Sequence, residues 1–325
     1  MRMAEQDVLQ LLREHPSIFL SGEEISRRLG VSRTAVWKRV RHLKSLGYDI
    51  EALRRSGYRF IQAPDLLLPS EIKPLLTTKF LGQTIHYFHS IDSTNSKAYQ
   101  LALAGAGEGE VVIAESQSKG RGRLGRRWLS APFLNLCLSV VLRPQIPPSQ
   151  ASLVTLMAAV ATADAIQIYS GLLPQIKWPN DILLRDRKVA GLLNEIHSET
   201  DRVHFVILGI GINLNMEGKT FPQEIRALAT SLKQEMRQTV SRKVFLKSLL
   251  EELERWYGIF SKKGGGAILE AWRKRSGIRG KRVKVNSFGE TLNGTAIDVD
   301  SDGALILKMG DGSQKRVVAG DVVYK

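Results

Sequence analysis

The sequence contains only one cysteine, Cys137, among its 325 residues. A single cysteine cannot form a disulfide within the chain, so the small disulfide-stapled secreted classes are excluded. Because Cys137 lies within an apolar run, we expect it to be a small core residue. The amino terminus carries no apolar leader, and we expect no segment to span a membrane. These absences predict a cytoplasmic protein with no membrane partner.

Several catalytic signatures are also missing. The sequence lacks Gly-x-Ser-x-Gly, the nucleophile turn of many hydrolases, and it lacks a complete Walker sequence. Its six histidines show no spacing that is typical of a metal site. We therefore expect neither a hydrolase of that type nor a metal ion held by the protein alone.

Acidic residues are in deficit, with 32 Asp and Glu against 47 Lys and Arg, and the net charge of +15 predicts polyanionic partners. The positive charge per residue is highest in the two end segments, and the residue patterns of the ends also differ from that of the middle. We predict three domains: residues 1–63, residues 64–270 and residues 271–325, with a linker near 63–69.

Residues 1–63 have the pattern of a winged helix-turn-helix. Ser21 begins a capping-box sequence, and the short helix that follows stops at Gly30. Ser32 is placed to cap the next helix, and this turn between two short helices is typical of the motif. Residues 48–61 alternate around a basic tip and predict a hairpin, the wing.

This first domain predicts DNA binding. The third helix would enter the major groove, and the hairpin arginines would contact phosphates. The predicted DNA-binding residues are Ser32, Arg33, Thr34, Lys38, Arg41, Arg54 and Arg55. The alternative is a small helical domain with a solvated basic face, but the capping box, the turn and the basic hairpin together favour DNA.

Residues 116–128, here called the arginine loop, contain three glycines and four arginines and end at Trp128. Glycines let backbone N–H groups converge on one point, and arginine forks match phosphate oxygens. Because the like charges repel, we expect the loop to order when an anion binds. A solvated surface loop is the alternative, but it would need neither three glycines nor the flanking tryptophan.

The glycines of the arginine loop, Gly120, Gly122 and Gly125, also match the dinucleotide fingerprint G-x-G-x-x-G. That fingerprint requires a helix that opens within it and holds a pyrophosphate at its N-terminus. The next regular pattern is strand-like, over residues 136–142. We therefore reject a nicotinamide site.

The rest of the middle domain alternates strands and helices. A polar corner at residues 92–95 follows a strand over 84–91, and residues 151–169 predict a buried core helix because they are apolar nearly all round. Residues 176–184 and 187–195 predict a hairpin whose lysines converge on one pocket, although paired surface lysines are an ordinary alternative.

Glycines recur near the end of this domain. Those within a strand over residues 203–214 suggest close approach of a ligand or of neighbouring backbone. Residues 264–266 are three glycines and predict a flexible break after an amphipathic helix. Residues 271–325 read as short strands separated by Asp-Gly and Gly-Asp-Gly turns, which predicts an SH3-like barrel without catalytic groups.

Together these motifs resemble the biotin protein ligases, specifically the bifunctional bacterial type that also represses the biotin operon. The resemblance covers the whole chain in order and rests on residues 92–95, 117, 120–128, 177–181, 188–191 and 211–213. It implies an α+β multidomain fold: a winged helix-turn-helix, an α/β biotin/lipoyl-ligase-like catalytic core and a small SH3-like β-barrel.

The resemblance implies a two-step reaction. The biotin carboxylate attacks the α-phosphate of MgATP and gives biotinyl-5′-AMP and pyrophosphate. A lysine of the biotin carboxyl carrier protein of acetyl-CoA carboxylase then takes the biotinyl group. The adenylate-bound homodimer would bind operator DNA and repress biotin genes. ATP, Mg²⁺ and biotin are the implied ligands.

The resemblance also implies roles for single residues. The catalytic residues would be Lys188, Arg121 and Arg123. The biotin-binding residues would be Ser93, Thr94, Asn95, Gln117, Arg121, Gly122, Arg123, Lys188 and Gly191. The ATP- and adenylate-binding residues would be Arg126, Trp128, Lys177, Asn180, Asp181 and Asn213, with Mg²⁺ brought by ATP and placed near Asp181.

Two alternatives remain. A lipoate protein ligase has a related core and the same adenylation chemistry, but the winged helix and the arginine loop as written speak against it. A biotin-sensing repressor without ligase activity would share the DNA-binding domain. Intact Lys188 and intact loop arginines favour an active enzyme.

Overall fold

A computed structural model of the chain describes residues 3–63, 65–129, 131–287 and 289–324. These residues form two compact units, Met1–Leu66 and Leu67–Lys325. Pro64, which we placed in the linker, lies outside the described residues.

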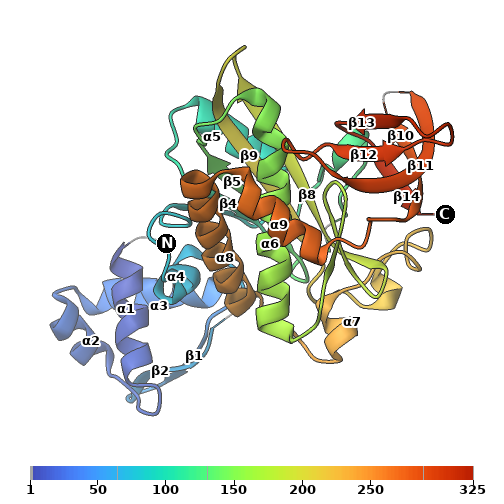
Figure 1. Ribbon diagram of the computed structural model, residues 1–325. Coiled ribbons are helices and arrows are strands. Elements are labelled where there is room, and N and C mark those ends of the chain that lie inside the picture. The colour runs from blue at the N-terminus through green and yellow to red at the C-terminus, as the bar shows by residue number, and fades with distance from the viewer. Residues whose placement is uncertain (1–2, 64, 130, 288, 325) are drawn as a thin grey trace. The chain divides into compact units, whose positions relative to one another are not determined.

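The first unit has three helices followed by an antiparallel hairpin (Figure 1). Its elements are α1 (Met3–Glu14), α2 (Gly22–Leu29), α3 (Arg33–Ser45), β1 (Asp49–Leu53) and β2 (Gly57–Gln62). Ser21 Oγ accepts a hydrogen bond from Glu24 N at 3.1 Å, and Ser32 Oγ accepts one from Ala35 N at 3.2 Å. Gly30 ends α2 in the left-handed region, with φ 62°. The predicted winged helix-turn-helix is confirmed.

The second unit is organised around a seven-stranded sheet of order β3-β4-β5-β9-β8-β7-β6. Its strands are β3 (Ile85–Phe88), β4 (Val111–Ala114), β5 (Leu136–Leu142), β6 (Gln175–Lys177), β7 (Asp181–Leu184), β8 (Arg187–Ser198) and β9 (Val203–Ile212). Strands β3 and β4 are parallel, and every other pair is antiparallel. Short turns join β6 to β7, β7 to β8 and β8 to β9, whereas longer segments link the first strands.

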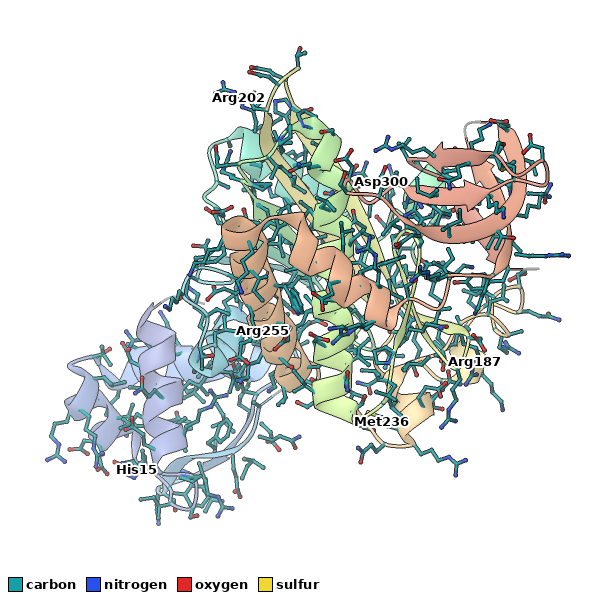
Figure 2. All side chains as sticks on the ribbon, in the orientation of Figure 1. His15, Arg187, Arg202, Met236, Arg255 and Asp300 are labelled. Atoms are coloured by element: carbon teal, nitrogen blue, oxygen red, sulfur yellow. The ribbon has the colours of Figure 1, made fainter. Side chains whose placement is uncertain are left out.

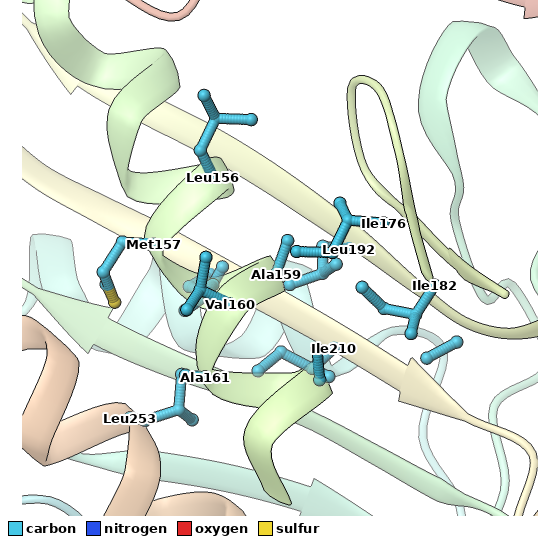
Figure 3. Close-up of a cluster of buried hydrophobic side chains, with 14 of the residues drawn as sticks. Leu156, Met157, Ala159, Val160, Ala161, Ile176, Ile182, Leu192, Ile210 and Leu253 are labelled. Carbon is cyan, nitrogen blue, oxygen red and sulfur yellow. The ribbon is translucent and has the colours of Figure 1, made fainter. Parts of the chain in front are cut away.

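Helices cover both faces of this sheet (Figure 1). The helices of this unit are α4 (Pro69–Ile72), α5 (Thr94–Leu103), α6 (Ala151–Ser170), α7 (Leu232–Met236), α8 (Arg242–Lys263) and α9 (Gly265–Arg275). Alternate strand residues separate the two layers, since Val111 packs in the core under α6 whereas Val112 packs with Ala98 of α5. Figure 3 shows the α6 side, where Met157 and Val160 lie among side chains of the sheet and of α8.

Helix α6 confirms the prediction of a buried core helix. With the preceding 3₁₀ turn η3 (Pro148–Gln150), it is long and apolar enough to cross a membrane by length and composition alone. However, 78% of that apolar window is buried inside the protein. Asp164 of α6 accepts hydrogen bonds from Trp256 Nε1 and Arg255 Nη2 of α8, both at 2.8 Å, and forms an ion pair with Arg275 of α9.

Two predictions about local structure were wrong. Residues 176–184 form two antiparallel strands, β6 and β7, in which Lys177 pairs directly with Asp181, because residues 178–180 make a tight turn. The glycines at 264–266 are no flexible break: Gly264 caps α8 through Phe260 O, and α9 begins at Gly265. Both predictions relied on residue composition and overlooked a tight turn in the first case and a helix cap in the second.

The C-terminal barrel has the strand order β13-β12-β11-β10-β14. The strands are β10 (Arg282–Ser287), β11 (Glu290–Val299), β12 (Leu305–Lys308), β13 (Gln314–Val317) and β14 (Asp321–Tyr324). Trp178 Nε1 donates to Gly303 O at 3.1 Å, so the barrel is fixed to the turn between β6 and β7. The predicted barrel is confirmed, but the sequence interpretation missed β14.

Candidate functional site

The floor of the candidate site is a row of small residues on the α5 face of the sheet. Gly209 of β9 pairs with Ser139 of β5 and with Leu193 of β8, and Gly211 pairs with Gly191. The missing side chains leave room for two other groups. A Cβ on Gly209 would lie 2.1 Å from Asn95 Oδ1, and one on Gly211 would lie 2.3 Å from Trp128 Cε2. Close approach was predicted at these glycines, but the groups that approach are the side chains of Asn95 and Trp128, where a ligand or neighbouring backbone was expected.

The polar corner lies at the start of α5, where Ser93 is the N-cap. Gln117 Oε1 accepts hydrogen bonds from Thr94 N at 2.8 Å and from Thr94 Oγ1 at 3.1 Å. Ser139 Oγ lies 2.8 Å from Thr94 Oγ1 and 2.5 Å from Asn95 Oδ1. Ser93, Thr94 and Asn95 are at most 4% exposed. The corner is therefore a connected, buried set of donors and acceptors.

The arginine loop folds back on itself as a short hairpin. Gly122 N donates to Arg126 O at 2.7 Å, and Trp128 N donates to Gly120 O at 2.9 Å. Between them, η2 (Arg123–Gly125) is a single 3₁₀ turn with Leu124 at φ 54°. A Cβ on Gly120 would lie 2.5 Å from Trp128 O, so glycine is required there. A hairpin in place of a helix opening agrees with the rejection of a dinucleotide site.

Carboxylates contact several cations of the site. Arg121 Nη2 donates to Glu195 Oε2 at 2.9 Å, and Lys188 Nζ lies 2.5 Å from Asp181 Oδ1. Arg126 forms an ion pair with a carboxylate of the barrel, Asp321. An incoming anion would meet cations that are already positioned.

Arg123 is held deeper than its neighbours. Its Nη1 donates to Gly320 O at 3.2 Å and to Asn180 Oδ1 at 3.4 Å. Burial lowers the pKa of the Arg123 guanidinium, while the charges of Asp321 and Asp181 act to raise it. Because arginine stays protonated even so, Arg123 supplies a permanent positive charge to the lining of the cleft.

A cleft joins the polar corner, the arginine loop and the sheet floor. All residues predicted to bind biotin line it: Ser93, Thr94, Asn95, Gln117, Arg121, Gly122, Arg123, Lys188 and Gly191. Of the predicted ATP-binding residues, Arg126, Trp128, Asn180 and Asp181 also line it. These residues come from five separate stretches of sequence, and the fold brings them together.

A second cavity, of about 420 Å³, adjoins the cleft. The two share Arg126, Arg127, Trp128, Asp181 and Lys188, and the cavity adds the predicted residues Lys177 and Asn213. Its far wall is apolar and contains Met216, Phe221, Ile225, Leu228 and Ala229. At the boundary, Lys188 Nζ lies 5.7 Å from the centre of the Trp128 ring. The buried Trp128 Nε1 has no hydrogen-bond partner among the described residues.

One end of the second unit supports this cavity. The loop after β9 leads into α7, and Arg187 Nη2 at the start of β8 donates to Glu235 Oε1 of α7 at 2.5 Å. Figure 2 labels Arg187 and Met236 at this end of the unit. Asn213 Nδ2 donates to Thr230 O at 3.1 Å, so Asn213 also holds the loop in place.

Sequence reasoning missed several residues at these two spaces, among them Asp321 and Tyr324 in the lining and Glu195, which contacts lining residues but lines neither space. Glu195 contacts both Asn95 and Arg121, and Asp321 and Tyr324 come from a barrel that we expected to carry no functional groups. Tyr324 is packed beneath Lys177, whose Nζ lies 5.3 Å from the ring centre. Burial, with the nearby charges of Asp186 and Asp181, raises the pKa of Tyr324 to about 12. Nothing near Glu195 in the sequence indicated these contacts, because an acidic residue is ordinary on a partly exposed strand.

The predicted DNA-binding residues gather mainly in one groove of the first unit. Arg33, Thr34 and Arg41 of α3, with Arg54 and Arg55 of the wing, line it. Ser32 is the cap of α3, and Lys38 is exposed on the same helix but does not line the groove. The groove also contains Trp37, which is 49% exposed beneath the guanidinium of Arg41. An exposed tryptophan on α3 was not predicted.

Comparisons with known proteins agree with this architecture. Residues 87–213 match the model of the "Biotin/lipoate A/B protein ligase family". Residues 5–59 match an "HTH domain", and residues 279–324 match the "Biotin protein ligase C terminal domain". The matches follow the same order as the winged helix, the sheet and the barrel.

Two curated relatives and one solved structure extend the comparison. The chain is 38% identical over 317 residues to the "Bifunctional ligase/repressor BirA" of Bacillus spizizenii, covering 98% of this chain and 97% of the relative. It is 30% identical to the protein of that name from Escherichia coli, covering 94% and 92%. The biotin protein ligase of Aquifex aeolicus, solved with biotin and ATP, has a TM-score of 0.64 at 25% identity and covers 75% of this chain and 99% of that one. The chain therefore belongs to the biotin protein ligase family, in its bifunctional ligase/repressor branch.

Proposed function

We propose that the chain is an ATP-dependent biotin ligase that forms biotinyl-5′-AMP and transfers the biotinyl group to a lysine of a biotin carboxyl carrier protein. The observation that carries this proposal is the meeting of two different spaces at Lys188. On one side lies a narrow polar cleft, and on the other lies a wider cavity with an apolar wall. The polar cleft suits a small ring with amide groups, and the apolar wall suits a flat base.

The reaction joins two anions, a carboxylate and a polyphosphate. The catalyst must therefore supply positive charge at fixed positions, more than it must supply an acid or a base. Lys188 stands at the junction of the two spaces, and Arg121 and Arg123 lie on the cleft side. We assign these three residues to the carboxylate and α-phosphate oxygens. Releasing Lys188 from Asp181, which lies 2.5 Å away, would be part of substrate binding.

Biotin would occupy the cleft against Ser93, Thr94, Asn95 and Gln117, above the floor that includes Gly191. Gly122 would bring the loop backbone close to it. ATP would place its base against the apolar wall and its phosphates near Arg126, Lys177, Asn180, Asp181 and Asn213. Trp128 separates the two sites, and its unpartnered Nε1 is free to donate to a substrate oxygen.

Magnesium fits the site only as a companion of ATP. The described residues contain no group of three His, Cys, Asp or Glu side chains that could hold a metal ion. Mg²⁺ commonly binds one or two carboxylates together with substrate phosphates, and Asp181 can supply one carboxylate at the phosphate end. When bound, the ion would neutralise phosphate charge.

The first unit extends the proposal to gene regulation in the cytoplasm. Its groove joins α3 with the wing and carries five of the seven predicted DNA-binding residues. We propose that the biotinyl-5′-AMP-bound protein forms a homodimer and binds the operator of biotin genes, because two winged helices match two half-sites. The adenylate can act as corepressor only by favouring the state that binds DNA more tightly.

One assay separates this proposal from its alternatives. Purified protein with MgATP should release pyrophosphate when biotin is added, and no pyrophosphate when lipoate is added. Release with lipoate alone would identify a lipoate ligase, and release with neither acid would leave a repressor without ligase activity. Adding a biotin carboxyl carrier domain should then yield a biotinylated lysine, detected by mass spectrometry.

The repressor function needs its own test. A gel shift on the promoter of the chain's own biotin genes should show tighter binding with biotin and ATP present. Equal DNA affinity with and without both ligands would remove the corepressor role and leave the ligase role standing.

A further inference from the structure

A single carboxylate oxygen connects the polar corner to the arginine loop. Glu195 Oε2, on β8, accepts a hydrogen bond from Asn95 Nδ2 at 2.7 Å and another from Arg121 Nη2 at 2.9 Å. Asn95 lies at the start of α5, and Arg121 lies in the loop. Glu195 therefore stands between two elements that the proposed reaction needs but that are distant in sequence.

The hydrogen bond between Asn95 and Glu195 determines the orientation of the Asn95 side-chain amide. An amide can present its oxygen or its nitrogen to a neighbour, and the partners around it determine which. A carboxylate offers only acceptors, so Glu195 selects the nitrogen of Asn95, Nδ2. On the other side, the Ser139 hydroxyl lies 2.5 Å from Asn95 Oδ1 and can donate to it. These two partners hold the amide in one orientation above Gly209.

The second contact ties the loop to the sheet. The Arg121 side chain is 45% exposed and Glu195 is 29% exposed, so their ion pair is a modest, reversible restraint. Replacing the carboxylate by a neutral amide would keep an acceptor for Asn95. It would remove the charge that attracts Arg121.

We propose that Glu195 is a positioning residue, which fixes the Asn95 amide for the ring of biotin and anchors Arg121 of the arginine loop. The inference rests on the proposed function, because its first half requires biotin in the cleft. The two halves need different chemistry: Asn95 needs an acceptor, and Arg121 needs a negative charge. Two substitutions at one position can therefore separate them.

The experiment compares Glu195→Gln and Glu195→Ala with the wild type. In the pyrophosphate assay, Glu195→Ala should raise the KM for biotin roughly tenfold or more and leave kcat within about threefold, because the buried Asn95 amide loses its acceptor. Glu195→Gln should keep the KM within about threefold of wild type. Added to Asn95→Ala, Glu195→Ala should raise the KM no further, since coupled partners are not additive.

The loop is tested without any ligand. Limited trypsin digestion, with the cleaved bonds identified by mass spectrometry, reports how often the arginine loop opens. Both Glu195 variants should be cut in the loop roughly twofold to fivefold faster than the wild type, as expected for loss of a partly exposed ion pair.

Tyr99→Phe is the matched control. It removes the next contact between α5 and β8, in which Tyr99 Oη lies 3.0 Å from His197 Nδ1, and it touches neither Asn95 nor Arg121. Its biotin KM and its loop cleavage should equal those of the wild type. A change in either one as large as that in Glu195→Ala would mean that general loosening of α5 explains the data and would overturn the proposal.

Two further results would each refute one part of the proposal, either the positioning of the Asn95 amide or the anchoring of Arg121. If Glu195→Gln raises the biotin KM as much as Glu195→Ala does, an acceptor for Asn95 is not what the site needs. If neither variant is cut faster in the loop, Glu195 does not anchor Arg121. A wild-type protein that releases no pyrophosphate with biotin would refute the proposed function instead, and the cleavage comparison would still decide the anchor.

Discussion

Replacing Gly209 by alanine should weaken biotin binding while the protein stays folded. Gly209 lies on β9, and the Asn95 side chain occupies the space where a Cβ would stand. That Cβ would lie 2.1 Å from Asn95 Oδ1 and 2.8 Å from Asn95 Cγ, whereas ordinary contact begins near 3.4 Å. Asn95 must therefore move by about 1 Å or more, since the backbone of a central strand cannot yield easily.

The size of the effect follows from the contacts that Asn95 would lose. Its oxygen lies 2.5 Å from Ser139 Oγ, and its nitrogen lies 2.7 Å from Glu195 Oε2. A buried amide left without partners costs about 1–3 kcal/mol, and each 1.4 kcal/mol is a factor of ten in affinity. We therefore expect the biotin Kd to rise roughly tenfold to a hundredfold and the free energy of unfolding to fall by about 1–3 kcal/mol.

Calorimetric titration with biotin in the absence of ATP measures this directly. Gly258→Ala, within α8, is the control, because a Cβ there meets nothing within 4 Å. It should leave biotin affinity unchanged and stabilise the helix by about 0.5–1 kcal/mol. If Gly209→Ala keeps wild-type affinity in a natively folded protein, Asn95 does not contact biotin, and the placement of the ring in this cleft is wrong.

Three further outcomes are expected. Lys188→Ala should lower the rate of biotin-dependent pyrophosphate release by about 10²–10³ with an unchanged melting curve, and a wild-type rate would exclude Lys188 as the catalytic cation. Arg55→Ala should weaken DNA binding across sequences and reduce the salt slope by about one, whereas Thr34→Ala should change sequence preference, as gel shifts at several salt concentrations would show. Arg242→Met should lower the free energy of unfolding, measured with denaturant, by roughly 3–5 kcal/mol, because it leaves the charge of the buried Glu115 carboxylate, 2.6 Å from Arg242, without its partner. A loss below about 1 kcal/mol would mean that the core adapts.

Much of the fold and of the candidate site could be predicted because the decisive signals are local. Ser21 and Ser32 cap helices through backbone groups only three residues away. Glycines within β9 marked close approach, and the groups that approach are Asn95 and Trp128. Such features depend on neighbouring residues or on the absence of a side chain, and both can be read from a sequence.

What could not be predicted depends on segments that are far apart. Asp321 reaches Arg126 only because the barrel packs against the sheet, almost two hundred residues later in the chain. The apolar wall around Phe221 and Leu228 comes from an irregular loop, which has no periodicity to indicate its fold. Glu195 looked like an ordinary strand residue, since nothing near it in the sequence reveals that Arg121 lies beside it.

The long-range contacts also explain how the cleft stays assembled before substrate arrives. Several cations brought together would repel one another, and here three of them are paired with carboxylates from other segments: Arg121 with Glu195, Lys188 with Asp181, and Arg126 with Asp321. Each pair is partly exposed to solvent, so each contributes at most about 1 kcal/mol. Arg121 makes one hydrogen bond to Glu195, whereas a substrate phosphate could accept two parallel hydrogen bonds from one arginine, which would favour the exchange of carboxylate for phosphate. Under the proposed function, the carboxylates would hold the cations in place yet release them readily, and this weak pairing would let the arginine loop bind and free its ligands.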